Sequence, residues 1–92
     1  MLKGSKIAYD ESLVIHMVVD VMSTVPGVDK NKSLNVVLSA SHKQIDVFFT
    51  PLSSILNIYD LANRIQSIIY MKLKKTFDLY SFIVNINVLG RN

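Results

Sequence analysis

His16 and Asp20 are the residues best placed for acid–base chemistry, because they stand four positions apart in a segment with helical spacing. Residues at that spacing share one face of a helix, where a carboxylate can orient an imidazole that acts as a general base. The sequence supplies no nucleophile to complete such a set, and His42 stands in a predicted turn beside Lys43. We therefore interpret both histidines as surface residues and expect no catalytic residue and no enzyme activity.

Metal and cofactor sites lack their usual ligands in this sequence. The chain has no cysteine, which excludes thiolate metal sites, disulfides and iron–sulfur clusters. It has three glycines and no glycine-rich phosphate-binding loop. The turn Pro26-Gly27-Val28 is similar to one in ferredoxin-like metal carriers, but those proteins need a cysteine pair that this chain lacks. We expect no metal and no cofactor.

The length of 92 residues allows a single domain, residues 1–92. The composition is 50% hydrophobic and 18% charged, which excludes an intrinsically disordered chain. The net charge of +3 is only mildly basic. No signal-like segment opens the sequence, and its apolar runs are far shorter than the roughly 20 residues that span a bilayer. The expected location is the cytoplasm.

Hydrophobic spacing predicts two helices. Asp10 can cap the first, which should end at Pro26-Gly27 because the residue before a proline avoids helical geometry. Its apolar face comprises Val14, Met17, Val18, Val21 and Val25. The second helix is expected to start at a cap on Ser53 or Ser54 and to run to about Lys75. Its apolar stripe comprises Ile55, Ile58, Tyr59, Leu61, Ala62, Ile65, Ile68, Ile69 and Leu73.

Alternation of apolar and polar residues predicts strands over residues 34–39, 45–49 and 80–89, and a short additional strand over 6–9. Pairing Val36 with Val47 puts the inward residues of the first two strands on one face, and it also pairs Leu38 with Ile45. This register requires a loop of two or four residues. The second helix joins the second strand to the last, so these two strands should run parallel.

The element order is helix-strand-strand-helix-strand, which predicts an α+β fold. Two helices would cover one face of a three- or four-stranded mixed sheet, as a two-layer sandwich. The opposite face would be uncovered, and most of its residues are polar, as exposure requires. This face is predicted to carry Asn35, Val37, Ser39, Asp46, Phe48, Ile83, Asn85 and Asn87.

Three apolar residues, Val37, Phe48 and Ile83, stand on this face beside the amides of Asn85 and Asn87. A mixed patch of this kind can bind a protein partner or a second copy of the chain, and the sheet edges can accept an added strand. The alternative interpretation is that the three are scattered exposed apolar residues, which are common.

RNA binding is the main alternative function, because the element order resembles that of the second type of KH domain and of small ribosome-maturation factors. Such a domain needs a glycine-rich loop that clamps the nucleic-acid backbone, and only Gly27 stands near the first helix. The basic patch for this function would be Lys72, Lys74 and Lys75. These lysines can also be a solvated helix end, where cations suit the helix dipole.

Four stretches together resemble a known family: residues 4–9 (GSKIAY), 25–28 (VPGV), 61–66 (LANRIQ) and 82–88 (FIVNINV) with Gly90. In this order they are similar to the opening strand, the helix-to-strand turn, the middle of the long helix and the last strand of the bacterial alkaline-shock, or cell-envelope stress, family. The resemblance covers about residues 4–90.

The resemblance implies a small cytoplasmic protein without an established active site. Members of that family are linked to envelope stress, and some self-assemble or reach the membrane through an anchoring partner. This chain lacks the long charged tails of many members, which puts tail-mediated contacts in doubt. The implied function is a non-enzymatic interaction module that binds itself, a membrane-anchored partner or a cytosolic partner.

Overall fold

The structure is a computed structural model that describes residues 10–39, 41, 43–79 and 81–90. Its elements, in chain order, are α1 (Glu11–Thr24), β1 (Asn35–Ser39), β2 (Gln44–Phe49), α2 (Ile58–Lys72), the π-helical turn η2 (Leu73–Phe77) and β3 (Ile83–Val88). The α+β class and the helix-strand-strand-helix-strand order are therefore confirmed. The strand predicted over residues 6–9 lies outside the described residues.

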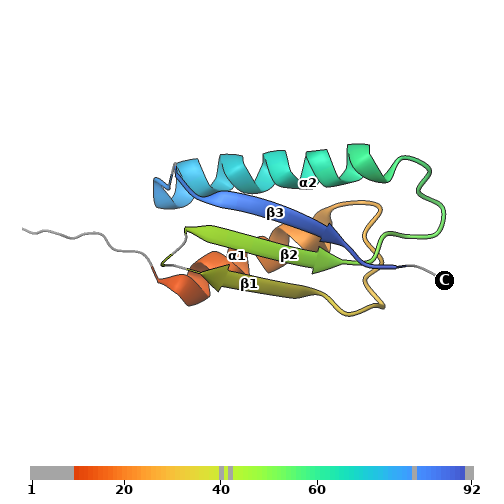
Figure 1. Cartoon of the computed structure of the whole chain (residues 1–92), viewed down its shortest axis with the longest axis horizontal. Helices are drawn as coiled ribbons and strands as arrows, with labels where there is room; N and C mark the ends of the chain where they lie inside the picture. Colours follow the sequence, from red (N-terminus) through yellow and green to blue (C-terminus); the bar gives the residue numbers. More distant parts are fainter. Residues whose placement is uncertain (1–9, 40, 42, 80, 91–92) are drawn as a thin grey trace, which may run out of the picture.

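The three strands form one mixed sheet in the order β1-β2-β3. β1 and β2 are antiparallel, with Val36 opposite Val47 and Leu38 opposite Ile45, as the alternation predicted. Ser39 pairs with Gln44, so the connection has four residues, one of the two predicted lengths. β3 runs parallel to β2, which confirms the crossover through α2. Figure 1 shows α2 running alongside β3, while α1 passes behind β1 and β2.

Helix α1 begins where the sequence predicted it. The carboxylate of Asp10 accepts a hydrogen bond of 3.0 Å from the backbone N–H of Ser12, which satisfies a free amide of the first turn. Val14, Val18 and Val21 are buried as expected, and so is Met22, which the predicted apolar face omitted. Met17 is half-buried at the margin of the core.

Helix α2 begins later than predicted, because its cap is Asn57 and not Ser53 or Ser54. The side chain of Asn57 accepts a hydrogen bond of 3.0 Å from the N–H of Asp60. The preceding chain is held extended, since the N–H of Leu52 donates to the carbonyl of Gly27 at 2.7 Å. A short antiparallel bridge between Val28 and Pro51 belongs to the same contact. The chain then forms a turn in which the N–H of Ile55 donates to the carbonyl of Leu52 at 3.1 Å, and this turn occupies the predicted helix start.

Further details of the second helix and the last strand differ from the prediction. Tyr59 is 85% exposed, because it lies two residues before buried Leu61 and therefore about 200° around the helix. The helix ends at Lys72 and continues as the π turn η2 rather than as one helix to Lys75. β3 starts at Ile83, since residues 81 and 82 are not part of the strand and residue 80 lies outside the described residues.

One hydrophobic core lies between the sheet and both helices. The inward residues of the central strand β2, Ile45, Val47 and Phe49, have no exposed surface. They pack in one cluster with residues of α1, α2 and β3, so both helices cover the same sheet face. The other buried hydrophobic residues of this cluster are Val14, Val18, Val21, Met22, Val25, Val28, Leu61, Ile65, Ile69, Leu73, Phe82 and Val84.

Candidate interaction surface

The sheet face opposite the helices, here called the open sheet face, consists of three rows across the strands. The strand register gives the rows Ser39–Gln44–Ile83, Val37–Asp46–Asn85 and Asn35–Phe48–Asn87. All eight residues predicted for this face lie on it, and Gln44 completes the set. A period of two along each strand was sufficient to find this face from the sequence.

The centre of the open sheet face is a network of polar side chains around Asp46. Gln44 donates its side-chain amide to Asp46 Oδ2 at 3.1 Å, and Asn85 donates to Asp46 Oδ1, also at 3.1 Å. The side-chain amide of Asn87 donates to the backbone carbonyl of Val47 at 3.4 Å. These polar groups are therefore oriented by one another and not by water alone.

The three apolar residues of this face do not form one patch. Val37 on β1 is a diagonal neighbour of Phe48 on β2, because Val37 pairs with Asp46, two residues before Phe48. Ile83 lies in another row on β3, beyond Gln44 and Asp46. Val37 and Ile83 are 44% and 53% exposed, and Phe48 is half-buried. Val37 and Phe48 are therefore neighbours on the open sheet face, whereas Ile83 is not a neighbour of either.

The outer edge of β3 is partly closed by α2. Gln66 donates its side-chain amide to the carbonyl of Val84 at 2.8 Å, and the Tyr70 hydroxyl accepts from the N–H of the same residue at 3.0 Å. Neither side chain could be assigned to a site from the sequence, because the contact depends on how α2 is rotated against β3. Both residues are half-buried between the helix and the strand edge.

A groove of about 390 Å³ lies next to this closed segment of the edge. It is lined by Ala62, Asn63 and Gln66 of α2, by residues 85–87 of β3 and by Asp46. Most of the lining is carboxamide, and the one charged residue in it is Asp46. Two residues of the predicted interaction face, Asn85 and Asn87, thus belong to the groove as well as to the open sheet face.

The residues considered for catalysis were His16, Asp20 and His42. His16 and Asp20 are exposed on the outer side of α1, and His42 lies outside the described residues. Within the described part of the chain, no group of three or more histidine, cysteine or acidic residues is arranged to hold a metal ion. No helix among these residues has the length and hydrophobicity to cross a membrane.

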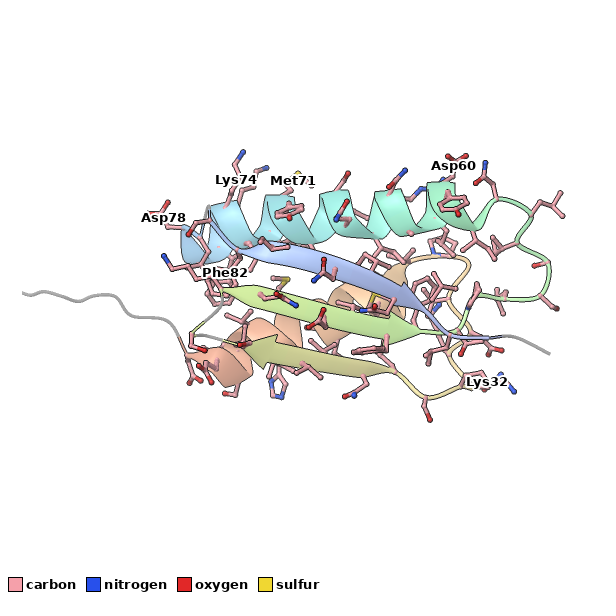
Figure 2. All side chains as sticks on the ribbon, viewed as in Figure 1. Lys32, Asp60, Met71, Lys74, Asp78 and Phe82 are labelled. Carbon is pink, nitrogen blue, oxygen red and sulfur yellow. The ribbon has the colours of Figure 1, made fainter. Side chains whose placement is uncertain are left out.

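The predicted basic patch occupies the far end of α2. Lys72 ends the helix, Lys74 and Lys75 belong to η2, and all three are exposed. Figure 2 shows Lys74 pointing away from the sheet, near Asp78, while Lys32 lies at the opposite end of the molecule. The described lysines are therefore divided between the two ends of the fold and are not gathered over one face.

Gly27, the residue nearest to a backbone clamp for RNA, has a packing role. It is buried, with φ at +103°, and a Cβ atom there would lie 3.0 Å from Ile55 Cδ1 and 3.2 Å from Leu61 Cδ1. The backbone of Gly27 therefore lies close to Ile55, which precedes α2, and to Leu61, which belongs to α2. The glycine is thus explained by a turn with positive φ and by close packing.

Exposed apolar residues that the sequence did not predict lie just before α2 and in its first turn. Leu56 is almost fully exposed and Tyr59 is largely exposed. The predicted apolar stripe included Tyr59, but the buried face of α2 is formed by Leu61, Ile65 and Ile69. Tyr59 lies about 200° from Leu61 around the helix and is therefore outside this face.

Comparisons with protein-family models, with curated proteins and with solved structures found no match for the chain.

Proposed function

We propose that this protein is a non-enzymatic interaction module that uses its open sheet face to bind a second copy of itself or a protein partner. The observation that carries the proposal is the network around Asp46. Because Gln44 and Asn85 already donate to this carboxylate, covering it with another surface strips away less water than covering an unpaired charge. The fixed side chains also lose little conformational freedom on binding.

The apolar side chains on either side of the network would supply the contact area. Val37 and Ile83 are about half exposed on the two outer strands, so a flat partner that covers the network also buries both. The resemblance to the alkaline-shock family leads to the same class of function, with a partner in the cytosol or a membrane-anchored one. RNA binding through Lys72, Lys74 and Lys75 has no comparable structural support.

Self-association is tested by sedimentation velocity over a wide range of protein concentrations. We expect the native protein to dimerise and the variants Val37→Asp and Ile83→Asp to remain monomeric. Phe48→Asp is a poorer probe, because Phe48 is half-buried and its replacement also affects the fold. Leu13→Asp is the matched control, since Leu13 is 54% exposed on α1, away from the open sheet face.

Binding to a different protein is tested by pull-down from separated membrane and soluble fractions of the native cell. A specific partner should be captured by the native protein and by Leu13→Asp, and lost with Val37→Asp and Ile83→Asp. A native protein that is monomeric at all concentrations would exclude self-association. Equal capture by all four proteins would exclude the open sheet face as the binding surface.

A further inference from the structure

The peptide groups of β3 alternate between two sides of the strand, and the hydrogen bonds show which residues face outward. The N–H groups of Ile83 and Leu89 donate to the carbonyls of Lys43 and Phe49, each at 2.8 Å, so odd-numbered residues face β2. Val84 faces the other way, toward Tyr70 and Gln66. Successive peptide groups alternate along a strand, so the N–H and C=O groups of Ile86 and Val88 also point outward.

These two outward residues form an open edge. β3 is the outer strand of the sheet formed by the described residues, and within them the peptide groups of Ile86 and Val88 have no hydrogen-bond partner on their outer side. Unpaired N–H and C=O groups in a row are a template for an added strand.

The groove beside β3 explains why the edge is open here and closed at Val84. Gln66 reaches the edge at Val84, whereas Ala62, one helical turn earlier, has no side chain long enough to reach Ile86. The space left by this small residue is part of the groove of about 390 Å³. The groove therefore provides room at the same place where the edge provides unpaired peptide groups.

The charge of the groove defines the side chains that suit it. Asp46 is its one charged lining residue. A strand added to β3 would lie two strand spacings from β2, which is about 9.6 Å. An extended lysine or arginine on the added strand and the Asp46 side chain on β2 can together span this distance. The next side chain along such a strand would point to the opposite face, toward Ala62, where an apolar group fits.

We infer that the free edge of β3 at Ile86 and Val88 binds an extended segment of another protein that alternates basic and apolar residues. This site differs from the open sheet face in its peptide groups and in its wall from α2, although Asp46, Asn85 and Asn87 belong to both. A second copy of the chain is a poorer occupant, because its own β3 (IVNINV) has no basic side chain to reach Asp46. Two β3 edges would also pair over Ile86 and Val88 alone, since Val84 is closed.

The test uses NMR titration of the full chain with an acetylated and amidated synthetic peptide of alternating valine and lysine. Binding is measured by amide shift changes, and protection by hydrogen exchange at Ile86 and Val88. Two comparison peptides carry glutamate in place of lysine, or N-methylated backbone amides with the same side chains. We expect the lysine peptide to bind and to slow exchange at Ile86 and Val88, and both comparison peptides to bind more weakly.

Variants of the protein locate the site. Ala62→Leu fills the groove and should weaken binding of the lysine peptide roughly tenfold, as expected for overfilling a packed space. Ser67→Leu makes a similar change at an exposed position of α2 outside the groove and should leave binding unchanged. Asp46→Asn should weaken binding by up to about fivefold, as for a solvent-accessible ion pair, and should reduce its salt dependence.

Unchanged binding to Ala62→Leu, or unchanged amide exchange at Ile86 and Val88 in the bound state, would overturn the inference. Equal binding of the glutamate peptide would overturn the basic specificity. Loss of binding in Val37→Asp with retention in Ala62→Leu would place the peptide on the open sheet face instead. Self-association that Ala62→Leu abolishes in the absence of peptide would identify a second copy as the occupant.

Discussion

The hydroxyl of Tyr70 accepts a hydrogen bond of 3.0 Å from the backbone N–H of Val84. Gln66, one turn earlier on the same helix, donates to the carbonyl of Val84 at 2.8 Å. Side chains of α2 thus satisfy both peptide groups of Val84 at the outer edge of β3. The helix that covers the inner face of the sheet also closes part of its edge, and directional bonds add to the apolar contacts between helix and strand.

Tyr70→Phe should lower the free energy of unfolding by about 1–3 kcal/mol, because it leaves the N–H of buried Val84 without its protein acceptor. The ring remains, so the apolar packing is kept. Chemical denaturation measures the change. Tyr59→Phe is the matched control, since the Tyr59 side chain is largely exposed and its hydroxyl loss should have almost no effect. Equal effects of the two variants would show that the Tyr70 bond contributes nothing.

Gly27→Ala should destabilise the fold by about 1–3 kcal/mol. An alanine there must adopt a positive φ, and its Cβ must displace Ile55 and Leu61 from contacts of 3.0 and 3.2 Å. Thermal or chemical unfolding measures the loss. Gly90→Ala provides the control, because no atom lies within 4 Å of a Cβ at that position. A neutral Gly27→Ala variant would mean that the turn can rearrange.

Proline substitutions along β3 should distinguish its two sides. Val88→Pro removes an outward N–H and should be tolerated, as proline is on edge strands. Asn87→Pro removes an N–H that faces β2, which leaves a carbonyl of β2 without its donor and should cost about 1–3 kcal/mol. Chemical denaturation and the dispersion of amide NMR signals report the two outcomes. Similar losses for both variants would contradict the alternation that the free edge requires.

The strand register could be predicted from the sequence because side chains alternate between the two faces of the sheet along each strand. A slip of one residue between β1 and β2 would turn Val36 and Leu38 away from the core, so burial allows one choice. The open sheet face follows from the same alternation. The cap at Asp10 could be predicted as well, because a capping side chain bonds to amides two or three residues away.

The start of α2 could not be predicted, because it depends on a contact between distant parts of the chain. The N–H of Leu52 bonds to the carbonyl of Gly27, and the chain then turns through residues 52–55 before the cap at Asn57. The groove beside β3 was missed for a related reason. Which residues of α2 reach the strand edge depends on the rotation of the helix, and that rotation differs from the predicted stripe that included Tyr59.

The cap of α1 should give the protein a defined acid dependence. Hydrogen bonds from the side chain and then the backbone N–H of Ser12 lower the pKa of Asp10 below its ordinary value of 3.8. A lowered pKa in the folded state means that folding favours the charged carboxylate. The stabilisation is therefore fully present above pH 3.8 and is lost as the pH falls through the lower pKa of the folded protein.

Asp10→Asn tests this dependence, because asparagine can still cap the helix but does not titrate. Stability is measured by chemical denaturation from neutral pH to the acid range for both proteins. The difference between native protein and variant should be constant above pH 3.8 and should shrink below it, as the native carboxylate becomes protonated. An NMR titration of the Ser12 amide should follow the same transition in the native protein. A difference that stays constant down to the lowest pH would contradict a charged cap at Asp10.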